Sequence, residues 1–286
     1  MIDVCCIGKY LIEKYPNSKI SYIGEGWSAI CFQVDDYIYK FSKQYFEDFV
    51  YEKIICDSIR DEVAFELPQI ELNFHQSYSM YNKLEGELGS EYLVSHPDEV
   101  EELPRDCARF LHQIHSCKMS NGVRNVPTLS GNTEDLSLFL RKIINNEKYE
   151  ALIIDNYQRI LADFAKETVL IHGDFYGSNF TVNDSGHLKG IFDWCNGGLG
   201  EREFDFVALY IHHGRNFTEK VIREYSFLSS ACLNKKRIMD LVWFRLINRT
   251  IYAMYDTYDL WTQFQQFCSD NQEEYGGMLY YGPVFI

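Results

Sequence analysis

Apolar and polar positions alternate in short runs over the first 85 residues of the chain. The runs rich in β-branched and aromatic residues occupy 21–24, 27–34, 37–41 and 78–84. Polar turns at 25–26 and 35–36 separate the first three runs, which predicts a three-stranded antiparallel meander with one further strand. Between the strands, residues 46–59 carry apolar side chains at helical spacing and predict a helix.

From residue 86 onward the pattern is mainly helical. Helices are predicted at 99–117, 134–145, 151–166, 217–228 and 236–261. Short apolar runs interrupt them at 169–171, 180–182 and 188–192, and these predict a β-ribbon near residues 169–193. We therefore expect an α+β fold of two lobes, a small β-rich lobe at 1–85 and a larger helical lobe at 86–286.

Composition and charge narrow the possible partners. Of the 286 residues, 46% are hydrophobic, which is enough for a sizeable core. The chain has 27 Lys and Arg against 42 Asp and Glu, a net charge of −15. An acidic surface repels a phosphate backbone, so we expect no nucleic-acid partner. It can attract a cationic small molecule, although acidity also serves simply to keep a protein soluble.

The cysteine pattern and the lack of long apolar runs bear on location. The nine cysteines are odd in number and form no C-x-x-C pair, which favours reduced thiols over a disulfide frame. No uninterrupted apolar stretch approaches the ~20 residues of a membrane span. The first residues do not have the pattern of a signal peptide. We expect a cytoplasmic protein with no membrane partner, and the sequence predicts no particular oligomeric state.

The polar loop between the apolar runs at 169–171 and 188–192 carries the most specific chemistry. Asp174 is followed five residues later by Asn179, and Asp193 lies beyond the predicted ribbon. This arrangement suits phosphoryl transfer, because one carboxylate can orient an attacking hydroxyl while an amide oxygen and a second carboxylate hold Mg²⁺. Turn capping explains Asp174 or Asn179 singly, but the spacing of all three favours catalysis.

These residues carry a family resemblance. The segment from His172 to Asn179 resembles the catalytic loop of the aminoglycoside phosphotransferase and choline-kinase-like family, which has the protein-kinase fold. Phe192-Asp193-Trp194 is similar to that family's metal-binding segment. The resemblance extends from about residue 20 to about residue 209. It implies a bilobal kinase-like fold, with Asp174 as the catalytic carboxylate and Asn179 and Asp193 as Mg²⁺ ligands.

The resemblance also assigns supporting roles around the loop. Asp205 is expected to brace the catalytic loop through hydrogen bonds, and His172 to order it. His115, in a segment that resembles the helix behind the loop, is expected to be a packed core histidine. The family often has Asp where this chain has Glu201, which precedes Asp205 in the acidic stretch.

In the first lobe, Lys40 on the third predicted strand occupies the position where the fold places its phosphate-binding lysine. Its expected partner is Glu52 in the middle of the following helix, with Glu47 as the alternative. The residues expected to form the loop over the phosphates are Gly24, Gly26 and Ser28, although a hairpin turn explains the glycines equally well. No P-loop motif is present. The base is expected near 78–84, and the choice between ATP and GTP stays open.

Four acidic residues are candidates for binding a cationic acceptor: Glu201, Glu203, Asp256 and Asp259. The last two share a helix face and lie among aromatic residues, which suits an aminosugar, although a solvated helix edge explains each equally well. The resulting prediction is transfer of the γ-phosphoryl group of ATP or GTP to a hydroxyl of an aminoglycoside-type antibiotic, which would confer resistance.

Two other functions fit the same motifs. The shared catalytic residues suit a metabolic kinase that acts on choline, a sugar or an amino-alcohol. A nucleotide-binding pseudokinase is the other alternative. A protein kinase is not favoured, because only eleven residues separate Asp193 from Asp205, too few for a peptide-docking activation segment.

Overall fold

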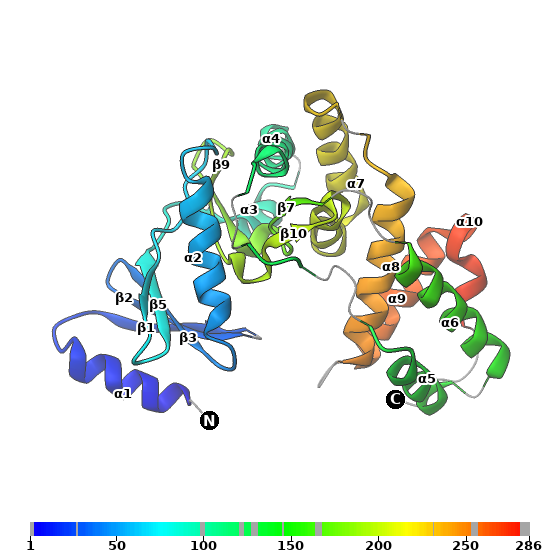
Figure 1. Ribbon diagram of the computed structural model, residues 1–286, viewed down its shortest axis with the longest axis horizontal. Helices are drawn as coiled ribbons and strands as arrows, with labels where there is room; N and C mark the ends of the chain where they lie inside the picture. Colours follow the sequence, from blue (N-terminus) through cyan, green and yellow to red (C-terminus); the bar gives the residue numbers. More distant parts are fainter. Residues whose placement is uncertain are drawn as a thin grey trace.

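The computed structural model describes residues 3–26, 28–97, 101–119, 123–126, 131–144, 146–163, 168–230, 232–252 and 257–280. The chain forms a lobe built on a β-sheet and a larger lobe built mainly of helices, with helix α2 (Glu47–Ile59) on the side of the sheet that faces the helical lobe (Figure 1). The predicted α+β division into two lobes is confirmed.

The first lobe contains an antiparallel sheet with the strand order β1-β2-β3-β5-β4. The strands are β1 (Ile20–Glu25), β2 (Ala29–Val34), β3 (Tyr37–Ser42), β4 (Glu71–Asn73) and β5 (Tyr78–Asn82). Strand β3 lies in the middle of the sheet and is buried on both faces from Ile38 onward. Lys40 is therefore held inside the lobe, with 4% of its surface exposed.

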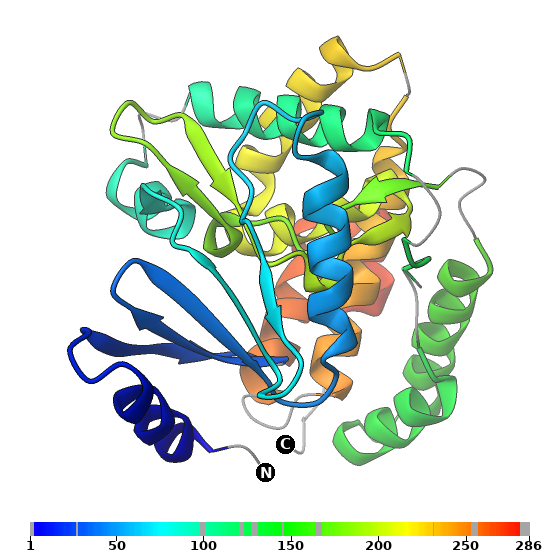
Figure 2. The ribbon, with the colours of Figure 1, turned by 60° about the vertical axis from the view of Figure 1, so that its left-hand side comes forward.

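Helix α1 (Val4–Lys14) was not predicted from the apolar pattern. It begins at an Asp3 cap, whose carboxylate accepts a hydrogen bond from the Cys5 amide at 2.7 Å. Only Ile7 and Leu11 of the helix are buried, and they pack against the aromatic core of the sheet. Helix α1 lies at the edge of the first lobe, away from the helical lobe (Figures 1 and 2).

Helix α2 agrees with its prediction to within one residue. Its buried positions are Phe49, Glu52, Ile55, Cys56 and Ile59. They form one stripe at helical spacing, so the helix presents a continuous face to the protein interior. The stripe includes one carboxylate, which is thereby directed inward with the apolar side chains.

The second lobe consists mainly of helices. They are α3 (Gly89–Ser95), α4 (Glu102–Ser116), α5 (Thr133–Ile143), α6 (Glu147–Ala162), α7 (Asp205–Leu228), α8 (Lys235–Ile251), α9 (Thr257–Asp270) and α10 (Gln272–Tyr275). Helices α4, α7 and α8 share the main core with α2 of the first lobe. No helix in the described ranges is long and apolar enough to cross a membrane.

The helix predicted at 151–166 is shifted by about one turn relative to α6, and two other helix predictions differ more from the structure. The helix predicted at 217–228 is the second half of α7, which begins at Asp205. Gly214 has φ 75° and ψ 176°, outside the helical region, and this kink interrupts the periodicity that the prediction relied on. The helix predicted at 236–261 corresponds to α8 and the start of α9, and residues 253–256 between them lie outside the described part of the chain.

The short strands of the second lobe form two small sheets. Strands β6 (Glu87–Leu88), β8 (Phe180–Val182) and β9 (Leu188–Ile191) form one, and β7 (Val169–Ile171) pairs with β10 (Gly198–Gly200) in the other. The single ribbon predicted over 169–193 was therefore wrong for β7. Its partner β10 has the sequence Gly-Leu-Gly, which gives no apolar signal of a strand.

Candidate active site

The three residues of the predicted catalytic motif are positioned by the ends of short strands. Asp174 lies on the loop after β7, Asn179 immediately precedes β8, and Asp193 follows β9. The Asn179 side-chain nitrogen donates to the Asp174 backbone oxygen at 2.8 Å and lies 3.5 Å from Asp174 Oδ2. The nitrogen is thus engaged by the loop, and the amide oxygen is the group that Asn179 can offer to a cation.

The backbone at Asp193 has an unusual conformation. Its φ and ψ are 63° and 59°, in the left-handed region that residues other than glycine seldom adopt. Such a conformation costs about 1–3 kcal/mol and persists only where the surrounding structure enforces it. The Asp193 carboxylate lines the cleft between the lobes, where it contacts Lys40.

Lys40 joins the two lobes through its ammonium group. Nζ lies 2.9 Å from Glu52 Oε2 and 2.9 Å from Asp193 Oδ1. The predicted preference for Glu52 over Glu47 is confirmed, because Glu47 is exposed at the start of α2 and Glu52 lies in the buried stripe. Burial acts to lower the pKa of Lys40, but the neighbouring Asp193, Cys195 and Glu52 outweigh it and raise that pKa well above its usual value.

A buried hydrogen-bond network holds the loop that carries Asp174. The Asp205 carboxylate accepts bonds from the backbone amides of His172 at 3.0 Å and Gly173 at 2.7 Å. Because a carboxylate can only accept, His115 Nε2 donates to Asp205 at 3.1 Å, and His115 Nδ1 bonds to the Tyr225 hydroxyl at 2.9 Å. His115 is therefore more than the packed core residue that was predicted. It supports the residue that braces the loop.

The His172 side chain orders the loop from within. Its Nδ1 accepts from the Asp174 backbone amide at 3.3 Å, so Nε2 carries the proton and donates to the Phe192 carbonyl at 3.1 Å. His172 is fully buried. The His172 ring thus links the loop that carries Asp174 to the residue preceding Asp193. Through these two bonds it helps to fix the distance between the two carboxylates.

The two carboxylates have different electrostatic surroundings. Burial raises the pKa of Asp174, and the charge of Arg245 only partly opposes this. Burial also acts to raise the pKa of Asp193, but the Lys40 ammonium outweighs it and the pKa is lowered. Asp174 is thus the better proton acceptor, while Asp193 stays ionised and suited to a cation.

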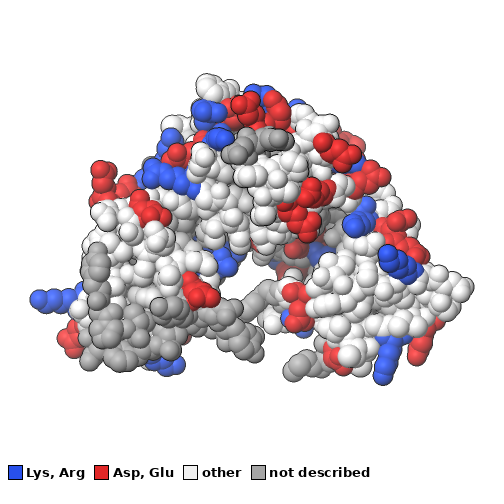
Figure 3. Space-filling view, turned by 180° about the vertical axis from the view of Figure 1, so that it is seen from behind, with Lys and Arg blue, Asp and Glu red and all other residues white. Residues whose placement is uncertain are grey.

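The residues of both lobes meet at a cavity of about 460 Å³. Its polar lining includes Lys40, Asn179 and Asp193, and its apolar lining comes from side chains such as Tyr81 and Phe192. Seen from behind, the molecule is hollowed between its two halves, and basic and acidic atoms lie at the top of the hollow (Figure 3). A cleft with one apolar region and one charged end suits a ligand that has a flat base and a phosphate chain.

The predicted phosphate loop lies at the β1–β2 turn. Gly26 N donates to Ala29 O at 2.9 Å, and Lys43 N donates to Ser28 O at 2.8 Å. A side chain added at Gly24 or Gly26 would meet nothing within 4 Å. Packing within the protein therefore does not explain these glycines, and the open space above them leaves the backbone accessible to a ligand.

Two sets of side chains in this region resemble cation sites. Ligand atoms of Glu52, Asp193 and Cys195 lie within 4.8 Å of one another. Lys40 Nζ already contacts all three, with Cys195 Sγ at 3.5 Å, so the ammonium satisfies this set and a metal ion does not fit there. Asn179 and Asp193 offer hard oxygen atoms from the cleft wall, which is the donor type that Mg²⁺ prefers.

The described acids among the four predicted to bind the acceptor have different surroundings. Glu201 is 3% exposed and forms a bidentate pair with Arg237 at 2.7 Å, so its predicted role in binding substrate was wrong. Glu203 is half-buried and accepts from the Asn234 amide. Asp259 is exposed on the first turn of α9, and Asp256 lies outside the described residues.

Sequence reasoning missed the side chains that surround Asp174 on its other side. Arg245 Nη2 lies 3.5 Å from Asp174 Oδ1, and Arg249 follows one turn later on α8. The Tyr176 ring stacks on His212 with centroids 4.1 Å apart, and His213 Nε2 accepts from the Gly177 amide at 2.8 Å. The sequence feature that could have pointed to the arginines is their four-residue spacing, which puts Arg245 and Arg249 on one face of the helix predicted at 236–261.

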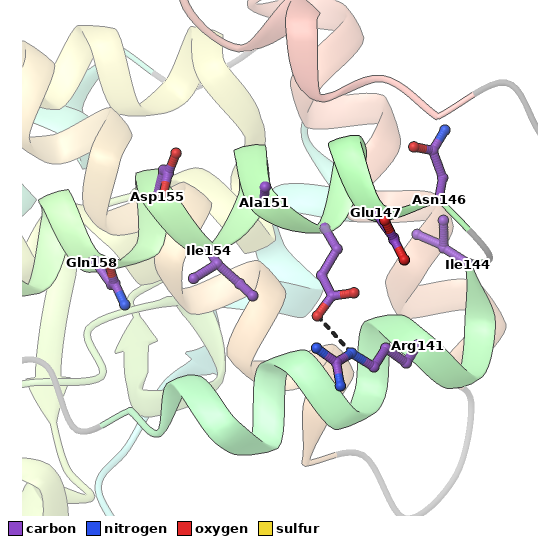
Figure 4. Close-up of a pocket in the computed structure, with 9 residues that line it drawn as sticks. Arg141, Ile144, Asn146, Glu147, Ala151, Ile154, Asp155 and Gln158 are labelled. Carbon is purple, nitrogen blue, oxygen red and sulfur yellow. Dashed lines mark hydrogen bonds and ion pairs between the residues drawn. The ribbon is translucent and has the colours of Figure 1, made fainter.

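A larger hollow of about 790 Å³ lies between α5 and α6. Arg141 Nε of α5 donates to Glu150 Oε1 of α6 across it at 2.9 Å (Figure 4). Its other charged side chains, among them Glu147 and Asp155, belong to α6. None of the predicted catalytic, metal or phosphate-binding residues lines this hollow, so size alone does not identify the active site.

Residues 19–233 match the sequence profile of the phosphotransferase enzyme family. Among solved structures, the chain is similar to the GDP complex of aminoglycoside 2′-phosphotransferase-IIIa (TM-score 0.72, 17% identity, 94% of this chain and 100% of that one). It is also similar to the streptomycin–ATP–APH(2″)-IIa ternary complex (TM-score 0.65, 18% identity, 98% of this chain and 100% of that one). A third similar structure is a choline/ethanolamine kinase family protein from Mesorhizobium loti (TM-score 0.69, 13% identity, 96% of this chain and 97% of that one). At these identities the similarities establish the kinase-like fold.

Proposed function

The chain belongs to the phosphotransferase enzyme family, and from this premise we propose that it transfers the γ-phosphoryl group of ATP or GTP to a hydroxyl of a small molecule. The observation that carries the proposal is the meeting of Lys40 with Asp193 at 2.9 Å, in the cleft whose lining also includes Asn179. A lysine, an amide oxygen and a carboxylate around one cavity are the groups that position a triphosphate.

Each residue has a defined task in this reaction. Asp174 accepts a hydrogen bond from the acceptor hydroxyl and orients its oxygen, for which its raised pKa is suited. Asn179 and Asp193 would hold Mg²⁺, which would neutralise phosphate charge. Lys40, held by Glu52, binds the phosphates, while Asp205 and His172 keep the loop rigid.

We assign nucleotide binding to residues 1–85 and acceptor binding to residues 86–286. Tyr81, Lys83 and Leu84 line the cleft, which supports placing the base there. The phosphates would pass under the turn that carries Gly24, Gly26 and Ser28, where the backbone is open. All nine cysteines carry free thiols, which supports a cytoplasmic location.

Two acceptor classes have support. The titles of neighbouring structures name aminoglycosides, and the net charge of −15 favours a cationic acceptor. A metabolite acceptor is favoured by the site itself, since two arginines on α8 lie on the side of Asp174 that an acceptor must approach. We give the local charge more weight, because a charge close to a bound ligand acts on it far more strongly than distant surface charge does. A pseudokinase has no need for this full set of catalytic groups.

A turnover assay tests the proposal. The purified protein is incubated with Mg²⁺, ATP or GTP, and a panel of aminoglycosides, sugars, amino-alcohols and hydroxy acids, and products are identified by mass spectrometry. We expect one acceptor class to gain a phosphoryl group, and Asp174→Ala to abolish that gain while nucleotide binding persists. Equal turnover by wild type and Asp174→Ala, or binding of nucleotide without transfer to any acceptor, would contradict the proposal.

A further inference from the structure

The two oxygens of the Asp174 carboxylate face different partners. Oδ2 lies 3.5 Å from the Asn179 side-chain nitrogen, on the side where Mg²⁺ is proposed to bind. Oδ1 lies 3.5 Å from Arg245 Nη2. The acceptor hydroxyl must reach this carboxylate to within ~3 Å. Since the metal side is taken by the nucleotide, the hydroxyl arrives beside Arg245.

A second arginine reinforces this charge. Arg249 is one helical turn after Arg245 on α8, and residues four apart share a helix face. The Arg245 guanidinium lies over the Phe204 ring, 5.8 Å from its centroid. Burial and the two guanidinium charges lower the pKa of the adjacent His212 to about 4, so its ring is neutral near pH 7. Among the described residues, the guanidinium charges of Arg245 and Arg249 both act on Asp174, and Asp193 adds one negative charge.

These arginines differ from the other half-buried or buried arginines of the lobe. Arg237 is paired with Glu201 and Arg159 with Asp240, each through two short bonds. Among the described residues, Asp174 is the sole carboxylate within 4 Å of Arg245, and Arg249 has none. A half-buried guanidinium without a protein partner is costly unless a ligand supplies the anion.

On the basis of the proposed function, we propose that the natural acceptor carries an anionic group, a carboxylate or a phosphate, near the hydroxyl that is phosphorylated, and that Arg245 and Arg249 bind it. A planar guanidinium matches both anions through paired N–H donors. This favours an anionic metabolite over an aminoglycoside, because the two guanidinium groups repel the positively charged amino groups of an aminoglycoside.

The inference also gives Arg245 a role in the order of events. In the structure it pairs with Asp174 Oδ1 at 3.5 Å. An incoming anion attracts the guanidinium and frees Oδ1 for the acceptor hydroxyl. In the reaction the acceptor oxygen forms a bond to the γ-phosphorus, the bond from that phosphorus to the leaving nucleoside diphosphate breaks, and the hydroxyl proton goes to Asp174.

The test uses pairs of acceptors that differ in one charge: glycerate and glyceramide, galacturonate and galactose, and glycerol 3-phosphate and glycerol. We expect at least one anionic member to have a higher kcat/KM than its neutral partner. Arg249→Gln should reduce that preference about tenfold to a hundredfold, the loss typical of a charged hydrogen bond, and Arg249→Lys should restore part of it. Arg215→Gln is the matched control, because Arg215 is exposed and pairs with Glu219 on α7.

Three results would overturn the inference. If the enzyme phosphorylates neutral or cationic acceptors and shows no preference for the anionic member of any pair, the inference of an anionic acceptor is wrong. The proposed phosphotransferase function would still stand. Equal loss of kcat for both members of each pair in Arg249→Gln would assign the arginines to the transferred phosphoryl group instead. If no acceptor gains a phosphoryl group and Asp174→Ala hydrolyses nucleotide as fast as wild type, the proposed function fails and this inference fails with it.

Discussion

Lys40 Nζ lies 2.9 Å from Asp193 Oδ1, although 153 positions separate the two residues. Glu52 completes the contact, since its Oε2 accepts from Lys40 and its Oε1 accepts from the Trp194 amide at 3.0 Å. A strand of the first lobe, helix α2 and the segment after β9 are thus joined at one point. The geometry of the cleft depends on these contacts, because Lys40, Glu52 and Asp193 each come from a different element.

Lys40→Met is expected to destabilise the fold. The change leaves the carboxylates of Glu52 and Asp193 without their shared cation, and Glu52 is fully buried. Removing one partner of a buried ion pair costs about 3–5 kcal/mol, so the free energy of unfolding should fall by about that amount. Urea unfolding followed by circular dichroism measures it.

The matched control is the double variant Lys40→Met with Glu52→Gln. The introduced glutamine keeps an oxygen that can accept from the Trp194 amide, and the buried negative charge is gone. We expect the double variant to recover a large part of the lost stability. If the double variant is less stable than Lys40→Met alone, then the buried charge is not the cause of the loss.

Asp174→Asn is expected to lower kcat for phosphoryl transfer by about 10²- to 10⁴-fold, because the amide cannot take up the acceptor proton. Nucleotide affinity, measured by calorimetry, should change little, since Lys40 and Asp193 are untouched. Asp184→Asn serves as the control, because Asp184 is exposed in the turn between β8 and β9. A similar loss of kcat in both variants would argue against the role of Asp174.

The position of the loop that carries Asp174 could be predicted from the sequence because its determinants are local. Asp174 and Asn179 are five residues apart, and short apolar strands flank them on both sides. Glu52 was preferred as the partner of Lys40 because it lies in the middle of the predicted helix, and in the structure it belongs to the buried stripe of that helix. In each case a few neighbouring residues decide the structure.

The acceptor side could not be predicted in the same way. Glu201 is buried because Arg237 pairs with it from 36 positions away, and nothing near Glu201 in the sequence shows this. Arg245 faces Asp174 only because α8 packs beside the loop, a tertiary arrangement that the helix pattern does not contain. The net charge of −15 predicted a cationic acceptor, but net charge does not describe the charge at one site.

The buried ion pair of Glu201 and Arg237 is expected to stabilise the fold. Glu201→Gln removes the negative charge from a buried bidentate pair and leaves Arg237 with a buried positive charge. We expect the free energy of unfolding to fall by about 3–5 kcal/mol. The corresponding change at an exposed pair, Glu219→Gln beside Arg215, should cost no more than about 1 kcal/mol. If Glu201→Gln instead raises the KM for the acceptor without loss of stability, then Glu201 belongs to the acceptor site after all.

The bond between His213 and the catalytic loop makes stability depend on pH. His213 Nε2 accepts from the Gly177 amide at 2.8 Å, which requires a neutral ring. Burial, and after it the charge of His212, lowers the pKa of His213 from 6.5 to about 4. Between these values the unfolded chain binds more protons than the folded chain. The stabilisation is therefore fully present above about pH 6.5 and is lost as the pH falls toward 4.

His213→Gln tests this linkage, since the glutamine oxygen can still accept from Gly177 but does not titrate. Melting temperatures measured from pH 4 to pH 7 should fall less steeply with decreasing pH in His213→Gln than in wild type. His75→Gln is the control, because His75 is exposed in the turn between β4 and β5 and should leave the wild-type slope in place. Parallel curves for wild type and His213→Gln would show that the proton uptake occurs elsewhere. In that case the hydrogen bond to Gly177 would not couple the catalytic loop to pH.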